Sequence, residues 1–260
     1  MSCNLAETEG MSGRADLHFH LLPGLDDGPA DLADSIELAR AAVAQGTAMV
    51  IATPHVRSDF VTDVADLRER VAELRLRLAD ARVPLAVGRG GELGHDMVPR
   101  LSQPELEAIA QGPPGARWML LEAPWEPYGE DFHAAADELR ERGFGVLIAH
   151  PERSADAELY ACEGLQRELR AGSRAQVNAM SLTGGHGTAA RTAAFELIGN
   201  ERVSLIASDA HGPTRPPHLR AAERELVEHG LAAPAARWLT HAAPLRLLAD
   251  GMTARRALVA

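Results

Sequence analysis

The chain has too few cysteines to build a disulfide framework or a cysteine-rich metal site. It contains two, Cys3 and Cys162, and neither belongs to a Cys-x-x-Cys pair. A zinc finger or a disulfide-stapled fold is therefore not supported. Cys162 falls in a stretch with a helical pattern and not in a glycine-rich phosphate loop. We expect it to be a small buried side chain and not a nucleophile.

Long apolar runs are also missing. No stretch approaches the ~18–20 consecutive apolar residues that a membrane-spanning helix needs, so insertion into a bilayer is not expected. The segment 1–13 is polar and acidic, and it has neither the basic start nor the apolar centre of a secretion signal. We expect a disordered tail at 1–13 and a single domain at 14–260, in a cytoplasmic protein.

The chain has fewer basic than acidic residues. The chain has 26 basic and 37 acidic residues, which gives a formal net charge of −11. Such a surface repels the phosphates of nucleic acids and anionic membranes, so partners of either kind are not expected. An anionic substrate would need local compensation from metal ions or from arginines.

What the sequence does contain is a regular alternation of short apolar runs and longer amphipathic stretches. This alternation is typical of parallel strands joined by helices, an α/β fold. The runs predict strands at 15–20, 47–53, 84–93, 118–122, 144–150, 175–178 and 203–208. The other stretches predict helices at 31–45, 62–82, 104–111, 130–142, 156–171, 187–199, 217–229 and 234–250, with Asp31 and Thr62 as caps of the first two.

About seven strand–helix units of similar length favour a distorted seven-stranded (β/α)7 barrel, whose active site would lie at the carboxyl ends of the strands. An open doubly wound sheet is the alternative. That fold would normally carry a glycine-rich nucleotide-binding turn after the first strand. This chain has prolines and aspartates there, in the segment Leu22–Pro29, so we favour the barrel.

Polar side chains stand at the downstream ends of most predicted strands. Alternate side chains of a strand share one face, so Asp16, His18 and His20 should point the same way. A polar face that merely meets solvent is the alternative for this run alone. The same placement recurs along the chain, and it makes nine candidate metal ligands: His18, His20, Asp27, His55, Glu92, Glu122, His150, Asp209 and His211.

These candidates offer nitrogen and oxygen atoms and no thiolate. One ion would use three or four of them, so the set predicts two or three divalent ions with a bridging carboxylate. Mn²⁺, Fe²⁺ and Zn²⁺ all fit, because the ligand types do not separate them. Clustered ions suit phosphate-ester hydrolysis, since they lower the pKa of bound water toward ~7 and clamp phosphoryl oxygens.

Two arginines follow candidate ligands closely enough to hold a substrate phosphate. Arg153 lies three residues after His150, and Arg215 lies four residues after His211. Guanidinium groups bind phosphate oxygens through paired hydrogen bonds, so both are candidate catalytic residues. Arg57 is a further candidate. The alternative for each is a role as a surface ion-pair partner.

Two aspartates near the candidate ligands could also take part in the site. Asp16 is expected to accept the ring N–H of a ligating histidine. Asp26 could take the place of Asp27, because the sequence hardly separates adjacent aspartates.

Aromatic residues and further histidines are less specific signals. Trp125, Tyr128 and Phe132 follow the fourth predicted strand, where they either wall an aromatic substrate pocket or pack in the core. The remaining histidines are expected at the surface or at helix caps: His95, His133, His186, His218, His229 and His241.

Taken together, these motifs resemble the polymerase-and-histidinol-phosphatase (PHP) superfamily. Within it, the chain resembles the bacterial manganese-dependent protein-tyrosine phosphatases of capsule and exopolysaccharide clusters, the CpsB/YwqE type. The resemblance covers residues 15 to about 250, and Val56 stands where many members have a second histidine. The motifs that carry it are Asp16–His20, Leu22–Pro29, Ala52–His55, Ala149–Arg153, Gln176–Asn178 and Ala207–His211.

The resemblance implies a distorted seven-stranded barrel with three metal ions. It assigns His18, His20 and Asp209 to one ion, with Glu92 bridging to a second. It completes the second ion with Glu122 and His150, and it assigns the third to Asp27, His55 and His211. Arg153 and Arg215 match the phosphate-binding arginines of the family.

The implied substrate is the tyrosine-rich tail of a cognate bacterial tyrosine kinase that controls polysaccharide export. Histidinol phosphate or another small phosphomonoester is the alternative substrate. A metal-bound scaffold or sensor without catalysis is the alternative class, and a purely structural site would need no flanking arginines. The sequence leaves the identity of the metal and the formation of a homo-oligomer open.

Overall fold

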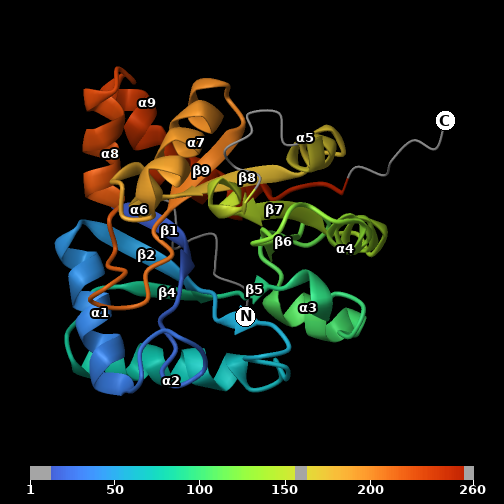
Figure 1. Cartoon of the computed structure of the whole chain (residues 1–260). Helices are drawn as coiled ribbons and strands as arrows, with labels where there is room; N and C mark the ends of the chain where they lie inside the picture. Colours follow the sequence, from blue (N-terminus) through green and yellow to red (C-terminus); the bar gives the residue numbers. More distant parts are fainter. Residues whose placement is uncertain (1–12, 156–162, 255–260) are drawn as a thin grey trace.

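The computed structural model describes residues 13–155 and 163–254. Short parallel strands alternate with helices in this part of the chain, so the predicted α/β class is confirmed (Figure 1). The strands are β1 (Arg14–Phe19), β2 (Thr47–Ala52), β3 (His55–Val56), β4 (Ala86–Arg89), β5 (Glu92–Leu93), β6 (Trp118–Glu122), β7 (Gly145–Ala149), β8 (Arg174–Asn178) and β9 (Val203–Ala207). The α-helices are α1 (Leu32–Ala44), α2 (Leu67–Asp80), α3 (Gln103–Ile109), α4 (Glu130–Glu141), α5 (Glu163–Arg170), α6 (Ala179–Leu182), α7 (Gly187–Gly199), α8 (Leu219–Glu228), α9 (Ala233–Arg237) and α10 (Ala243–Asp250).

The strands form two parallel sheets, with the orders β1-β2-β4 and β3-β5-β6-β7-β8-β9. The third predicted strand, 84–93, is interrupted once, while the second, 47–53, corresponds to β2 and is followed by a short strand, β3, that was not predicted. Residues 53–54 separate β2 from β3, and residues 90–91 separate β4 from β5. These interruptions are why the described residues contain nine strands in place of the expected seven.

Backbone pairing continues across both interruptions. The amide of Gly90 donates to the carbonyl of Ala52 at 2.9 Å, and the amide of Glu92 donates to that of Pro54 at 3.0 Å. Pro54 has no N–H to offer a ladder. A Cβ at position 90 would lie 2.8 Å from the side chain of Ile51, so only glycine allows this approach of the two strands. The interruptions are therefore local bends in paired chains.

The two sheets meet unequally at their two borders. At one border, the amide of His20 donates to Ala210 O at 3.0 Å, and that of Asp209 donates to His18 O at 2.9 Å, which ties β1 to the end of β9. At the other border, β4 pairs only with β2, and β5 covers only the later part of β6. We call this interruption of pairing, between β4 and the start of β6 at Trp118, the seam. A closed seven-stranded barrel is therefore not confirmed.

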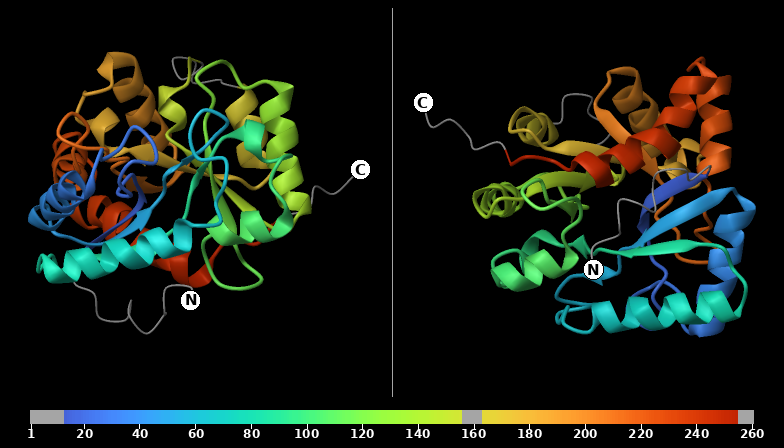
Figure 2. Two further views of the ribbon diagram at one scale, coloured as in Figure 1. Left: turned by 90° about the horizontal axis from the view of Figure 1, so that it is seen from below. Right: turned by 180° about the vertical axis from the view of Figure 1, so that it is seen from behind.

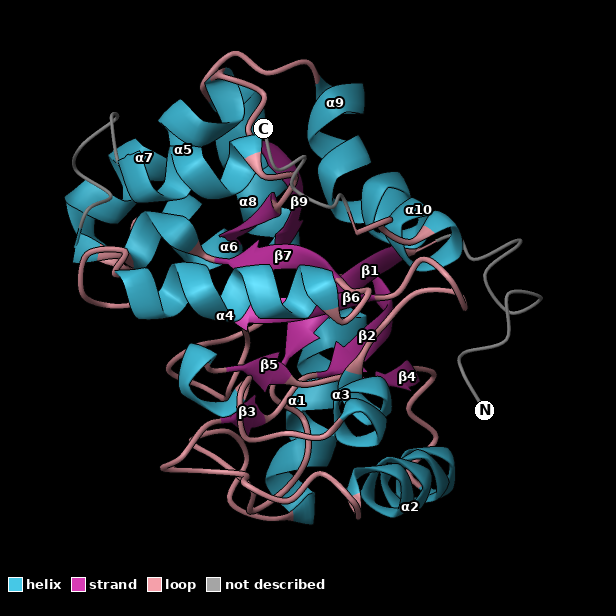
Figure 3. Cartoon of the chain, turned by 90° about the vertical axis from the view of Figure 1, so that its right-hand side faces the viewer, coloured by secondary structure: helices cyan, strands magenta, loops and turns pink. Residues whose placement is uncertain are grey.

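Helices cover the outside of the strands (Figures 2 and 3). The side chains that face inward from both sheets form one buried cluster, which includes Leu17, Trp118 and Leu205. Leu247 of α10 and Met252 belong to the same cluster and cover one end of it. Removal of these apolar side chains from water is the main force that holds the strands in register.

The boundaries of α1 and α2 show where local signals succeed and fail. The predicted cap of α1 is confirmed, because the Asp31 carboxylate accepts from the amide of Asp34 at 3.0 Å. The predicted cap Thr62 is wrong, because α2 begins only at Leu67. The carboxylate of Asp63 accepts instead from the amide of Ala65 at 2.8 Å, a local turn that competes with helix formation.

The last predicted helix, 234–250, is not uniform. A π-helical turn at Trp238–Ala242 separates α9 from α10. Pro244 lies in the first turn of α10 and has no amide for a regular helical bond, which accounts for the wider turn before it. In the predicted helix 156–171, the first seven residues, including Cys162, lie outside the described residues. None of the described helices is long and apolar enough to span a membrane.

Candidate metal centre

The carboxyl ends of the parallel strands bring all nine candidate ligands together. His18 is the penultimate residue of β1, and each of the others is the first or last residue of a strand or lies in the loop that follows one. Eight of them are buried, while the Asp27 side chain is 47% exposed. They form three groups in which one potential ligand atom of each residue lies within 4.8 Å of those of the others: His18, Glu92, His150 and Asp209; His20, Asp27, His55 and His211; and His55, Glu92 and Glu122.

The first group is the most deeply buried. His18 Nε2 lies 3.2 Å from Glu92 Oε2 and 3.3 Å from Asp209 Oδ1. His150 Nε2 lies 2.8 Å from the other oxygen of Glu92. Glu92 therefore presents its two oxygens to different histidines, which is the geometry of a bridging carboxylate.

The second group contains His20, which the family resemblance places with Asp209. His211 Nε2 lies 3.1 Å from Asp27 Oδ1, and His55 Nε2 lies 3.5 Å from the same oxygen. The rings of His20 and His211 stack with their centroids 3.7 Å apart. His20 Nε2 is also 3.4 Å from Asp209 Oδ1, so it stands between the first two groups.

Several buried polar atoms at the centre lack hydrogen-bond partners among the described residues: His55 Nδ1, Glu92 Oε2, Asp209 Oδ1 and His211 Nε2. In addition, His18 Nε2 and His20 Nε2 face each other at 3.2 Å. Buried polar atoms without hydrogen-bond partners are costly, by about 1–3 kcal/mol each. Divalent cations would compensate these atoms, so the residues present fit a metal centre.

Surrounding residues orient the histidines through their second ring nitrogen. Asp26 Oδ2 lies 2.7 Å from His20 Nδ1, and Gln176 Oε1 lies 3.0 Å from His18 Nδ1. Asp26 therefore supports a ligand, while its neighbour Asp27 faces the centre. The expectation for Asp16 is wrong, because its carboxylate accepts from the amide of Ser208 at 3.0 Å and not from an imidazole.

Burial and charge set the protonation of the centre. Burial alone would raise the pKa values of Glu92 and Asp209, but His18 and other nearby histidines hold both well below the ordinary range. Burial alone would lower the pKa of His20, but Asp26 raises it well above its usual value. Burial and the charge of Glu92 raise the pKa of Glu122 to about 7. Burial lowers the pKa of His150 to about 4, which leaves its ring neutral and able to bind a cation.

The backbone is strained where two ligands enter the centre. His150 has φ of +37° and Asp209 has φ of +52°, a region that side chains other than glycine seldom adopt. Such strain persists only when the surroundings impose it, and it concentrates at functional sites. It turns both side chains toward the centre immediately after a strand ends.

All three candidate arginines contact the ligand cluster. Arg153 Nη1 donates to Asp209 Oδ2 at 2.8 Å, and Arg215 Nη2 donates to the same oxygen at 2.7 Å. Arg57 Nη1 donates to both oxygens of Glu122 at 3.1 Å. Arg57 also pairs with exposed Asp59, and Arg215 with Asp27, but each of the three arginines donates to at least one buried candidate ligand.

A pocket of about 310 Å³ adjoins Arg153, and its lining also includes Trp125, Glu152 and His186. The Trp125 ring stacks on the Arg153 guanidinium, with 4.7 Å between the guanidinium carbon and the ring centroid. Phe132, in contrast, is fully buried in the core and does not line this pocket.

Sequence reasoning missed several residues near the site. His186 was expected at the surface or at a helix cap; it stands at the N-cap position of α7 and also lines this pocket, with its ring 3.0 Å from the hydroxyl of Ser181. Asn178 Nδ2 donates to Asp209 Oδ2 at 2.9 Å. Buried Glu152 accepts from Ser181, and burial raises its pKa to about 7. The only sequence signal for Glu152 and Asn178 was their place in the quoted motifs.

His133 was also expected at the surface or at a cap, and this is wrong. It is buried in α4, where its Nδ1 lies 2.6 Å from Glu168 Oε1. Arg140 bonds the other oxygen of Glu168, so the three residues form a buried network away from the metal centre.

Parallel strands, a buried histidine and carboxylate cluster and converging arginines define the site of a metal-dependent hydrolase. The chain belongs to the CpsB/CapC family of capsular polysaccharide synthesis, whose model matches residues 14–249. It is 32% identical to the tyrosine-protein phosphatase YwqE of Bacillus subtilis over 75% of this chain and 76% of that protein.

Solved structures agree with this assignment. The fold matches a chain from the structures of YwqE from Bacillus subtilis and CpsB from Streptococcus pneumoniae, described as unique metal-dependent tyrosine phosphatases. The TM-score is 0.77, with 29% identity over 93% of this chain and 96% of that one. An organophosphorus hydrolase from Deinococcus radiodurans shares the fold at a TM-score of 0.55 and 18% identity, over 92% of this chain and 93% of that one.

Proposed function

We propose that the protein is a metal-dependent phosphatase that removes phosphate from tyrosine residues of proteins. The observation that carries this proposal is the convergence of nine nitrogen and oxygen ligands with two arginines at one end of the strands. Its relatives YwqE and CpsB are named as tyrosine-protein phosphatases, which supports the same substrate class.

The nine candidate residues would hold two or three divalent ions, and we propose Mn²⁺ as the natural ion, with Fe²⁺ and Zn²⁺ fitting the same ligands. Bound ions would lower the pKa of water and neutralise charge on the phosphoryl group. Glu92 would connect two ions, since its two oxygens face different histidines. Asp26 and Gln176 fix the ring orientation of His20 and His18.

The chain's own groups would bind and orient the substrate. Arg153 and Arg215 point at one carboxylate oxygen of Asp209, so both can turn toward phosphate oxygens at the same place. Trp125 offers its indole face beside Arg153, where an aromatic side chain of the substrate would stack. Neutral His186 at the pocket wall can accept a hydrogen bond, because burial lowers its pKa to about 4.

We also propose that residues 14–260 form one domain, whose described part has the form of a distorted seven-stranded barrel. The pairing across both strand interruptions supports this, because β2 with β3 and β4 with β5 then count as one bent strand each. The contacts of β1 with the end of β9 close one border of that barrel.

The proposed physiological substrate is a phosphorylated bacterial tyrosine kinase of capsule or exopolysaccharide synthesis, acting in the cytoplasm. The family description names capsular polysaccharide synthesis, which supports this pathway. Comparison of kcat/KM on a phosphotyrosine peptide and on histidinol phosphate separates this substrate from a small phosphomonoester.

The test is phosphate release from p-nitrophenyl phosphate and from a phosphotyrosine peptide, with Mn²⁺, Fe²⁺, Co²⁺ or Zn²⁺ supplied in turn. His150→Ala should abolish turnover, since it removes a nitrogen ligand from the most buried group. Cys162→Ser should keep full activity, because the proposed chemistry uses no thiol. Absence of turnover with all four ions would overturn the proposal, and so would loss of activity in Cys162→Ser with intact folding.

A further inference from the structure

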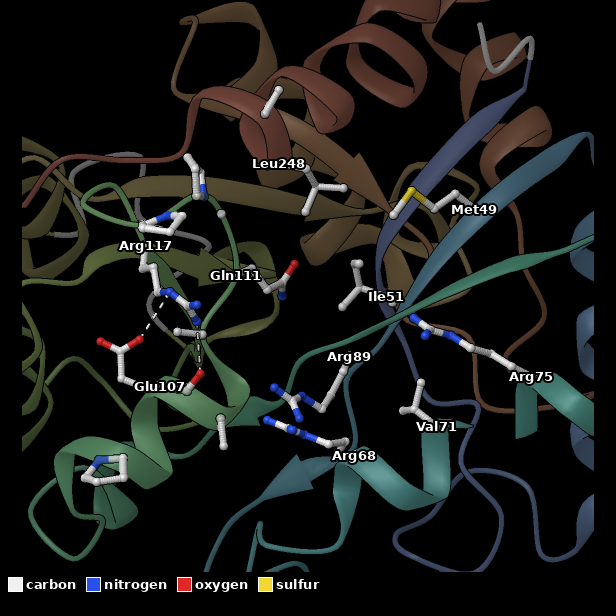
Figure 4. A pocket seen from close by; sticks show the side chains of 18 residues that line it. Met49, Ile51, Arg68, Val71, Arg75, Arg89, Glu107, Gln111, Arg117 and Leu248 are labelled. Atoms are coloured by element: carbon white, nitrogen blue, oxygen red, sulfur yellow. Dashed lines mark hydrogen bonds and ion pairs between the residues drawn. The ribbon is translucent and has the colours of Figure 1, made fainter. Parts of the chain in front are cut away.

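The seam opens into a second pocket, which shares no residue with the metal centre. Its volume is about 420 Å³, within the usual range for small-molecule sites. It is lined by the edge of β4, by the segment before β6 and by part of α10, as Figure 4 shows. The pocket exists because β5 is too short to fill the space between β4 and the start of β6.

The seam pocket is strongly basic, although the chain as a whole carries a net charge of −11. Four arginines line it: Arg68, Arg75, Arg89 and Arg117. Glu107 is its only acidic lining residue, so the formal charge of the lining is 4 − 1 = +3. The chain contains no lysine, so every one of these cations is a planar guanidinium suited to phosphate.

Two of the four arginines already have partners within the protein. Arg117 Nε lies 3.2 Å from Glu107 Oε2, and Arg75 Nε donates to the carbonyl of Val87 at 2.7 Å. Arg68 and Arg89, in contrast, have no hydrogen-bond or ion-pair partner among residues 13–155 and 163–254.

Arg68 and Arg89 also lie within range of each other's charge. Figure 4 shows their guanidinium groups together at the pocket. Burial and the neighbouring charges of Arg68 and Arg117 lower the pKa of Arg89. The charge of Glu69 acts in the opposite direction but does not outweigh burial and the like charges, so a bound anion would offset the remaining repulsion.

Gln111 provides an independent indication of a ligand. Its side chain lines the pocket, and the residue is only 4% exposed. Its backbone pairs with Trp118 in both directions at 2.9 Å, but neither atom of its side-chain amide has a hydrogen-bond partner among the described residues. A buried amide without partners costs about 1–3 kcal/mol per group, so it is expected where a ligand completes it.

The remaining walls are largely apolar. Met49 and Ile51 of β2 and Leu248 of α10 face the pocket (Figure 4). Gly90 leaves room between Gln111 and Ile51, since a Cβ there would lie 2.8 Å from atoms of both side chains. The pocket thus combines cations, an adjacent donor and acceptor, and an apolar surface.

We propose that the seam pocket binds a phosphorylated small molecule of the nucleotide class. The free guanidinium groups of Arg68 and Arg89 hold the phosphate oxygens through paired hydrogen bonds. The Gln111 amide forms hydrogen bonds with the donor and acceptor groups at the edge of the base. The face of the base packs on the apolar wall of Met49 and Ile51. This proposal does not depend on phosphatase activity, because no residue of the metal centre takes part.

The direct test is isothermal titration of the Mn²⁺-loaded full-length protein with α,β-methylene ADP and α,β-methylene UDP, which resist hydrolysis. Inorganic phosphate and uridine are titrated separately, to distinguish the contribution of the phosphate groups to the affinity from that of the base. We expect saturable binding of at least one nucleotide at one site per chain. Arg68→Gln and Arg89→Gln should each weaken it about tenfold or more.

Gln111→Leu should lower the affinity for the nucleotide. It should leave the weaker affinity for inorganic phosphate unchanged. The matched control is Arg224→Gln, an exposed arginine of α8 outside the pocket, which should change nothing. All variants should retain turnover of p-nitrophenyl phosphate, which shows that they are folded and that the metal centre is intact.

Three outcomes would overturn the proposal. The first is absence of nucleotide binding at millimolar concentration in the folded protein. The second is binding that His150→Ala weakens but Arg68→Gln and Arg89→Gln do not, which would place the ligand at the metal centre. The third is tight binding of an acidic peptide at Arg68 and Arg89 with no nucleotide binding, which would identify a peptide-docking site.

Discussion

The metal centre and the seam pocket handle charge in opposite ways. At the metal centre, Arg57, Arg153 and Arg215 all donate to buried carboxylates, and the unpartnered atoms belong to the acids and histidines. At the seam, the acids are nearly absent, and Arg68 and Arg89 remain without partners among the described residues.

The difference follows from how each site is built. The carboxyl ends of successive parallel strands always meet at one edge, so residues placed there converge whatever the helices do. The seam has no such rule, because it results from one short strand that leaves the sheet edges apart. The first site is thus poised for cations and the second for an anion.

The largest effect should come from removing the charge of Glu92, the carboxylate that we propose bridges two ions. Glu92→Gln keeps the shape of the side chain but removes its charge. Loss of several kcal/mol of transition-state stabilisation corresponds to a decrease in kcat/KM of about 1,000-fold. Phosphate release and elemental analysis measure the effect together. Glu73→Gln on the exposed face of α2 is the matched control, and retained activity with full metal content in Glu92→Gln would refute the assignment.

The next largest effect should be on stability when ions are supplied. Mn²⁺ at 100 times its dissociation constant should stabilise the folded state by about 2.7 kcal/mol. For a chain of this size, that corresponds to a rise in Tm of roughly 5–10 °C relative to the protein in EDTA. Differential scanning calorimetry measures it. Identical transitions with Mn²⁺ and with EDTA would argue against a preformed metal centre.

A smaller effect should follow from Trp125→Ala, which removes the indole beside Arg153. Loss of a cation–π contact and of an aromatic wall should cost about 0.5–1 kcal/mol, or roughly two- to fivefold in kcat/KM on a phosphotyrosine peptide. A non-aromatic phosphomonoester should lose less, because it shares only the effect on Arg153 and not the loss of the aromatic wall. Trp238→Ala is the control, because Trp238 is 44% exposed and stacks on Arg246 instead. Equal losses on both substrates would contradict a role in binding the aromatic ring.

The smallest effect should appear at the seam in the absence of ligand. Arg89→Gln removes one of the like charges, so the free energy of unfolding should rise by about 0.3–0.5 kcal/mol at low salt. High salt should abolish the gain, because it screens the repulsion. Urea unfolding at two salt concentrations measures it. Arg153→Gln should lower the free energy of unfolding, since it removes a partner of buried Asp209. Stabilisation by both substitutions would contradict the proposed difference between the two sites.

Sequence reasoning was most successful where a periodic pattern has one physical meaning. Short apolar runs predicted the strands, and polar residues at their ends predicted which side chains meet. Asp31 was recognised as a cap because its carboxylate can only serve the first turn of α1. The same local reasoning failed at Thr62, where the competing turn at Asp63 delayed α2.

Other features depend on contacts between distant segments, so no local pattern could reveal them. Asp26 and Asp27 are adjacent, yet one supports His20 and the other faces His55 and His211. The approach of Arg57 to Glu122 is likewise a contact between distant segments, because 65 positions separate the two residues. Burial of His133 and placement of His186 depended on how α4 and α7 pack against the strands.

By itself, the order of residues determined the α/β class and the set of side chains at the carboxyl ends of the strands. These follow from strand periodicity and from the common direction of parallel strands. Only the tertiary structure decided how the ligands divide into groups, which aspartate faces the centre, and where the sheets fail to pair. Each of those depends on the exact approach of segments far apart in the chain, which a one-dimensional pattern does not encode.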